Sequence, residues 1–174
     1  MITIISSTNR NDSVTYQLSQ LYQGILKKLN AECHLIDLNE LPPDFTVTAL
    51  YENSGKNEEF NKLRNIMKAS EKFVFIVPEY NGSFPGVLKA FIDGLEYPGT
   101  FRNKKCALVG LSSGLQGAGL ALSHLTDIFN YCGMHVLAQK PKLARIESNM
   151  EGPEITNERY MKHLWNQAEA LIAF

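Results

Sequence analysis

The residues of this chain that are best suited to chemistry gather in three short polar segments, each following an apolar run. The first segment, residues 6–15, combines serine and threonine hydroxyls with one cation, Arg10. Free backbone amides at a helix N-terminus carry partial positive charge, and hydroxyls and an arginine beside them suit a phosphate group. The chain contains neither GxGxxG nor GxxxxGK followed by S or T, so the segment predicts a mononucleotide phosphate rather than a dinucleotide. A capped helix with a solvated Arg10 fits the composition equally well.

The other two segments are loops built around proline and glycine. Residues 78–89 hold Glu79, Tyr80 and Asn81 between two prolines, which predicts a rigid bend whose amides can lie against the edge of a flat heteroaromatic ring. Glu79 alone would also suit the entry to a helix. Residues 112–119 are rich in serine and glycine, which lets a backbone approach a ligand closely, although a tight turn needs the same residues.

Short apolar runs alternate with segments of helical period along the chain, and this alternation fixes where the three loops lie. The predicted strands are residues 2–6, 33–38, 73–77, 107–111 and 135–138; the predicted helices begin after the Ser13 cap, at Asn57, near Pro85 and near Ala118, and a last one follows Thr156. The pattern favours one doubly wound α/β domain, residues 1–174, with helices on both faces of a parallel sheet. Ligands in such folds bind beyond the carboxyl ends of the strands, so we expect the three loops to meet at one edge. Residues 39–56 show no period and are expected to form a long loop, which either shapes the pocket or is a surface excursion.

Composition excludes several classes of protein. The 174 residues are 44% hydrophobic and 20% charged with a net charge of −1, which is typical of a folded protein and argues against a nucleic-acid partner. No apolar run reaches the ~18–20 residues of a membrane span, and no signal-peptide pattern is present, so we expect a soluble cytoplasmic protein without a membrane partner. Cys33, Cys106 and Cys132 lie far apart in apolar surroundings, and we expect free thiols, no disulfide and no metal.

Motifs in the three loops resemble those of a known family. Residues 78–89, PEYNGSFPGVLK, resemble the signature PEYNxSxPGxLK of the NADPH-dependent FMN reductases, a family of flavodoxin-like fold that includes azo-dye, quinone and chromate reductases. Residues 7–13 are similar to its phosphate loop GSxRxxS, with Ser7 in place of glycine. Residues 112–119 are similar to its glycine-rich flavin loop, with Ala118 where glycine is common. The resemblance extends over roughly residues 2–138.

The resemblance implies a flavodoxin-like three-layer α/β/α sandwich with a five-stranded parallel sheet in the order 2-1-3-4-5. It implies FMN as cofactor, NADPH or NADH as co-substrate, and a ping-pong reaction in which a hydride goes to flavin N5 and then to a small-molecule electron acceptor, without a catalytic side chain. The residues that match the family's cofactor-binding positions are Thr8, Arg10, Ser13, Val14, Thr15, Pro78, Glu79, Tyr80, Asn81, Gly82, Ser83, Ser112, Ser113, Gly114 and Gly117. Family members are commonly homodimers or larger, so we expect a homodimer or homotetramer.

Two other functions are compatible with such a fold. A flavodoxin-type electron carrier would hold FMN but serve protein partners; this chain lacks the TxTGxT-type phosphate run and the acidic face of such carriers. A receiver domain needs an acidic pair after the first strand and an aspartate after the third, where this chain has Ser6-Ser7 and Pro78-Glu79. The reductase interpretation is therefore favoured, with the acceptor and the choice between NADPH and NADH left open. His34, His124, His135 and His163 are expected on the surface or in the core rather than in catalysis.

Overall fold

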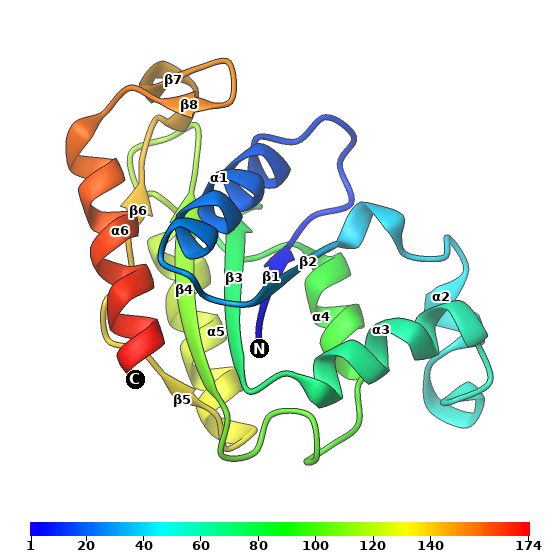
Figure 1. Ribbon diagram of the computed structural model, residues 1–174. Helices are drawn as coiled ribbons and strands as arrows, with labels where there is room; N and C mark the ends of the chain where they lie inside the picture. Colours follow the sequence, from blue (N-terminus) through cyan, green and yellow to red (C-terminus); the bar gives the residue numbers. More distant parts are fainter.

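The predicted strands assemble into a parallel sheet in the computed structural model, which describes residues 1–174 (Figure 1). Its order is β2-β1-β3-β4-β5, which confirms the predicted 2-1-3-4-5 arrangement. The strands are β1 (Ile2–Ser6), β2 (Cys33–Asp37), β3 (Lys72–Pro78), β4 (Lys105–Leu111) and β5 (His135–Val136). The central strands β1, β3 and β4 are buried almost throughout, as expected for parallel strands covered on both faces.

The edge of the sheet beyond β4 differs from the prediction of one strand over residues 135–138. Only His135 and Val136 pair with the start of β4, and a separate strand, β6 (Lys142–Leu143), pairs with its end. Between them the chain bulges away, and Pro141, which has no amide to donate, contributes only its carbonyl, which accepts from the amide of Gly110 at 2.9 Å. The predicted fifth strand is therefore divided into two short pieces.

Helices cover both faces of the sheet, and two apolar clusters lie beneath them. On one face α1 (Val14–Lys28) and α6 (Glu158–Ala173) pack over a cluster that includes Val74 and Ile76 of β3. On the other face α3 (Glu58–Ala69), α4 (Gly86–Asp93) and α5 (Gly119–Tyr131) pack over a cluster that includes Phe75 and Val77. Neighbouring residues of β3 contribute to different clusters because successive side chains of a strand point to opposite faces of the sheet. No helix is both long and apolar enough to cross a membrane.

Asparagine or serine caps begin three of these helices. The side chains of Ser13, Asn57 and Asn157 accept hydrogen bonds from the amides three residues onward, which satisfies amides that lack a helical partner. The helix expected to begin near Pro85 has this proline at its cap position, so that α4 starts at Gly86 and ends at Asp93.

The segment expected to be an irregular loop, residues 39–56, contains three helical turns: η1 (Leu38–Glu40), α2 (Phe45–Thr48) and η2 (Tyr51–Asn53). Phe45 explains their position, because its ring is buried and stacks on Phe60 of α3 with 5.5 Å between ring centroids. Downstream of β6, the turn η3 (Ile146–Asn149) leads into a small hairpin of β7 (Met150–Glu151) and β8 (Glu154–Ile155).

Candidate functional site

The carboxyl ends of β1, β3 and β4 open onto one cavity, where all three polar loops meet. It is lined by Thr8, Arg10, Asn11, Asp12, Ser13, Val14, Thr15, Pro78, Glu79, Tyr80, Leu111, Ser112, Ser113, Ile146 and Glu147. Of the residues predicted to bind a cofactor, only Asn81, Gly82, Ser83, Gly114 and Gly117 lie outside this lining. The topology therefore brings most of the predicted site to one place.

The first loop presents unpaired donors to this cavity. The amides of Asn11, Asp12, Ser13, Val14 and Thr15 have no hydrogen-bond partner within the chain. Arg10 is exposed and takes part in no ion pair. The hydroxyl of Ser13 accepts from the amide of Tyr16 at 3.1 Å, so it also organises the start of α1. An anion held here would meet both free amides and an unpaired guanidinium.

A short hydrogen bond joins the first loop to the second. The hydroxyls of Thr8 and Tyr80 lie 2.7 Å apart, and the Thr8 hydroxyl also accepts from the amide of Arg10 at 3.3 Å. Thr8 is buried, and its bond to Tyr80 holds its side chain in place. The hydroxyl of Thr8 thus aligns the two loops on either side of the cavity.

The second loop is a two-residue hairpin. Tyr80 and Ser83 exchange both backbone hydrogen bonds, at 2.8 and 3.0 Å. Between them Asn81 and Gly82 adopt positive φ angles of 51° and 75°, the combination that Asn-Gly favours in a type I′ turn. The amides of Asn81 and Gly82 have no partner within the chain, so this rigid turn carries two free donors.

The third loop is held by side chains that were expected to touch a cofactor directly. The carboxylate of Glu79, in the second loop, accepts from the amide of Ala118, in the third loop, at 3.1 Å. The hydroxyl of Ser112 accepts from the amide of Gly117 at 2.9 Å and donates to the carbonyl of Gly114 at 3.0 Å. Glu79 and Ser112 therefore shape the loop that follows β4, besides lining the cavity.

Close packing explains the glycine at position 117. It has a φ of +55°, and a methyl group on it would come within 2.8 Å of the carbonyl carbon of Lys142. At Gly114, by contrast, a methyl group would meet nothing within 4 Å. The loop is thus tight where it adjoins β6 and open at its exposed end.

Ser83 lies outside the cavity and turns toward α5. Its hydroxyl is 2.9 Å from Nδ1 of His124, an exposed residue on that helix. This histidine was expected to have no functional part, and the structure places it one hydrogen bond from the second loop. A sequence pattern does not reveal this pair, because the two residues are brought together only by packing of α5.

Ile146 and Glu147 also line the cavity although no sequence signal pointed to them. They reach it because β6 pairs with the end of β4 and returns the chain to the third loop. There the amide of Ile146 donates to the carbonyl of Ser112 at 3.0 Å, and that of Arg145 to the carbonyl of Gly114 at 2.9 Å.

The cavity suits a phosphorylated flavin. The free amides beside Arg10 match a phosphate, and the open backbone at Gly114 leaves room for a flat ring. Ser6, at the end of β1, is buried and its hydroxyl is the one buried side-chain polar atom of the chain without a partner. Flavodoxin-like folds bind FMN at this edge of the sheet, at the point where the strand order reverses.

Fold and site together define a flavin-dependent oxidoreductase of the flavodoxin-like class. The chain belongs to the NADPH-dependent FMN reductase family, whose sequence profile matches residues 1–145. FMN is accordingly its cofactor and a reduced nicotinamide nucleotide its co-substrate.

Comparison with individual proteins agrees with this assignment. The chain is 26% identical over 161 residues, 85% of its own length and 82% of the other's, to a 2-hydroxy-1,4-benzoquinone reductase from a Burkholderia species. It is 30% identical over 125 residues, 70% of this chain and 65% of the other, to an FMN-dependent NADPH-azoreductase from Staphylococcus saprophyticus. The structure of FerB, a flavoenzyme NAD(P)H:(acceptor) oxidoreductase from Paracoccus denitrificans, is 25% identical and superposes with a TM-score of 0.77, covering 99% of this chain and 94% of that one.

Proposed function

We propose that the three loops hold FMN in the cavity at the carboxyl ends of β1, β3 and β4. Thr8, Arg10, Ser13, Val14 and Thr15 would bind the phosphate. The ring would lie between the second and third loops, against Pro78, Glu79, Tyr80, Asn81, Gly82 and Ser83 on one side and Ser112, Ser113, Gly114 and Gly117 on the other. The observation that carries this proposal is the pair of bonds between loops, Thr8 to Tyr80 and Glu79 to Ala118, which fix the three loops relative to one another.

When bound, FMN supplies the two-electron chemistry, accepting a hydride from NAD(P)H and passing its electrons to an acceptor. The chain itself binds FMN and stabilises the negative charge that develops during the reaction. The unpaired amides of Asn81, Gly82, Ser113 and Gly114 are donors fixed in advance by the hairpin and by the Ser112 bonds. Preorganised donors of this kind stabilise negative charge that develops during a reaction, as an oxyanion hole does.

We propose a small electron-poor aromatic or azo compound as the acceptor. A quinone reductase and an azoreductase are both among the relatives, and both kinds of compound are flat enough to stack on a flavin. The exposed side chains around the third loop support this, because Leu115 and Leu120 are 70% and 59% exposed and offer an apolar surface beside the cavity.

We further propose that residues 1–174 fold as a single domain that forms a homodimer in the cytoplasm. An apolar groove between α4 and α5 supports the dimer, since it is bordered by Tyr97 and Tyr131, which are 66% and 80% exposed. Three free thiols are in keeping with a reducing compartment. Light scattering on the purified protein, which gives the mass of the particle in solution, tests the dimer.

An anaerobic absorption spectrum tests the function. Protein loaded with FMN is passed through gel filtration, and its flavin band is recorded before and after NADPH or NADH is added. We expect retained flavin that bleaches within the mixing time, followed by recovery of the band when a quinone is added. Retained flavin that neither nucleotide bleaches would favour an electron carrier, and loss of all flavin on the column would count against the proposed site.

A further inference from the structure

We propose that His124 of α5 is a positioning residue of the flavin site, which acts through Ser83 to hold the free amides of the second loop in place. Nδ1 of His124 lies 2.9 Å from the hydroxyl of Ser83. The hairpin that Ser83 closes carries the unpaired amides of Asn81 and Gly82. This role rests on the proposed function, because flavin is the group that these amides are proposed to meet.

The second loop is attached to α5 by two hydrogen bonds. The carboxylate of Glu79 accepts from the amide of Ala118 at the start of the helix, at 3.1 Å. Ser83 and His124 form the second attachment, about 9 Å further along the helix axis. A loop held by one bond is free to turn about it, whereas two separated bonds fix its direction. Because Glu79 and Ser83 flank the hairpin, the two bonds together fix the direction of its free amides.

His124 supplies the only side-chain anchor at the far end of the hairpin. At the near end the hydroxyl of Tyr80 bonds to that of the buried Thr8 at 2.7 Å. At the far end the hydroxyl of Ser83 has His124 as its single partner. The hairpin is therefore held to β1 through Tyr80 and to α5 through Ser83, and removing the imidazole releases the second of these attachments.

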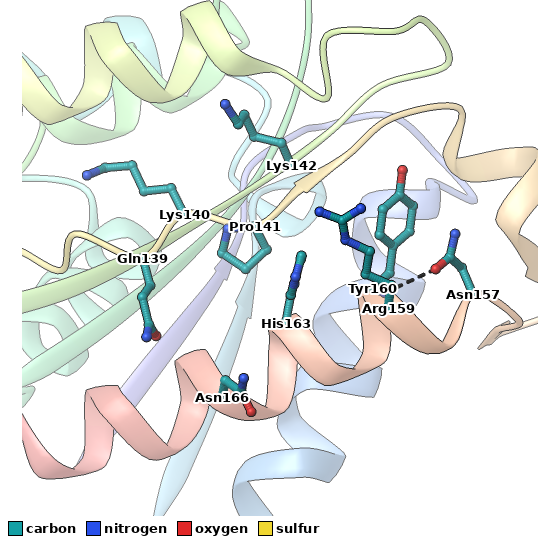
Figure 2. A pocket seen from close by; sticks show the side chains of 9 residues that line it. All are labelled: Gln139, Lys140, Pro141, Lys142, Asn157, Arg159, Tyr160, His163 and Asn166. Atoms are coloured by element: carbon teal, nitrogen blue, oxygen red, sulfur yellow. Dashed lines mark hydrogen bonds between the residues drawn. The ribbon is translucent and has the colours of Figure 1, made fainter.

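The other histidines of the chain show that this engagement is particular to His124. His34, His135 and His163 are also exposed, but their rings make no hydrogen bond within the chain. His163 projects from α6 into the pocket that it shares with Pro141, and it does not line the flavin cavity (Figure 2). His163 is therefore a suitable control for the loss of an exposed imidazole.

The direction of the hairpin amides affects reduced flavin more than oxidised flavin. The ring of reduced FMN carries additional negative charge, and a hydrogen bond to a charged acceptor is roughly twice as strong as one to a neutral acceptor. Donors that are fixed in advance stabilise such charge without reorganising. Releasing the hairpin from α5 therefore weakens the binding of reduced FMN more than that of oxidised FMN. If His124 only stabilised the fold, its loss would weaken both forms equally.

The ratio of the Kd values for reduced and oxidised FMN tests this role. Fluorescence quenching gives the Kd of the oxidised form, and anaerobic titration against a reference dye gives the reduction potential of bound FMN. In His124→Leu and Ser83→Ala we expect the ratio to shift roughly three- to tenfold against reduced FMN. A tenfold shift lowers the two-electron potential by about 30 mV. His163→Leu should leave the ratio unchanged, and His124→Asn, whose side-chain amide can place a polar atom where Nδ1 lies, should restore most of it.

Hydrogen exchange in the flavin-free protein tests the attachment apart from the flavin. The amides of Tyr80 and Ser83 bond to each other's carbonyls and are protected while the hairpin is closed. We expect both to exchange roughly threefold faster, or more, in His124→Leu than in the wild type, and at the wild-type rate in His163→Leu. Faster exchange in His124→Leu from a wild type that binds no FMN would refute the proposed function alone, and the attachment of the hairpin by His124 would stand.

Three results would overturn the role of His124. One is an unchanged exchange rate or an unchanged ratio of Kd values in His124→Leu. Another is an equal change in the His163→Leu control. The third is an effect of His124→Leu that persists in full when Ser83 is already replaced by alanine, because the imidazole would then not act through Ser83. Thermal unfolding and light scattering show that each variant is folded and keeps the particle mass of the wild type.

Discussion

Glu79 lies in a cavity proposed to bind an anion, yet we predict that removing its charge weakens FMN binding. Its carboxylate is the acceptor that holds the amide of Ala118, at 3.1 Å, and with it the start of the third loop. A hydrogen bond to a charged group contributes about 1.5–3 kcal/mol, so its loss in Glu79→Ala corresponds to roughly a 10- to 100-fold rise in the Kd for FMN. Glu79→Gln keeps a neutral acceptor oxygen, and we expect its Kd for FMN to rise by less than that of Glu79→Ala.

Glu147 supplies the matched control, because it lines the same cavity but makes no side-chain hydrogen bond or ion pair. Glu147→Gln removes one negative charge from the neighbourhood of the phosphate, so simple electrostatics predicts equal or tighter binding. The assay is quenching of FMN fluorescence on titration with each variant. Tighter binding in Glu79→Ala, or the same change in both variants, would refute the assignment of Glu79 as a residue that positions the third loop.

Other perturbations have similarly definite outcomes. Arg10→Ala should weaken FMN binding by about 1.5–3 kcal/mol, measured in the same titration; an unchanged Kd would remove Arg10 from the site. Gln167→Ala should lower the free energy of unfolding by about 3–5 kcal/mol in urea, because it leaves a cavity and removes the hydrogen-bond partner of the buried Tyr22 hydroxyl and Leu108 carbonyl and of the part-buried Gln139 carbonyl. Burial raises the pKa of the Cys106 thiol, so iodoacetamide at pH 8 should leave Cys106 unmodified in the native protein while it labels the half-buried Cys33 slowly. Equal labelling of both thiols by mass spectrometry would contradict this.

Periodicity and topology rules were sufficient to predict the sheet and its flanking helices. Val74 and Phe75 alternate between two buried faces, and such a strand is stable only between helices on both sides. The strand order then brings the three loops to one edge, which the cavity confirms as a meeting place. That these residues hold FMN stays a prediction, which the titration of the Arg10 and Glu79 variants with FMN tests.

Contacts between residues that lie far apart in the sequence were not predictable from it. The division of the fifth strand depends on which carbonyls of residues 135–143 the edge of β4 can reach. Glu79 reads as a possible ligand for a cofactor, and only the fold reveals that it bonds to an amide thirty-nine positions away.

The interrupted strand at this edge has a consequence for how the protein behaves in a crowded solution. A parallel sheet that ended in a long straight strand would offer a row of unpaired amides and carbonyls to any other extended chain. Here the exposed edge is broken after Val136, bulges outward, and continues through a lysine, a proline and a second lysine, Lys140 to Lys142. A foreign strand could form only a few bonds along it before meeting positive charge and a residue without an amide. The interrupted edge therefore disfavours aggregation by strand pairing between the sheets of two molecules.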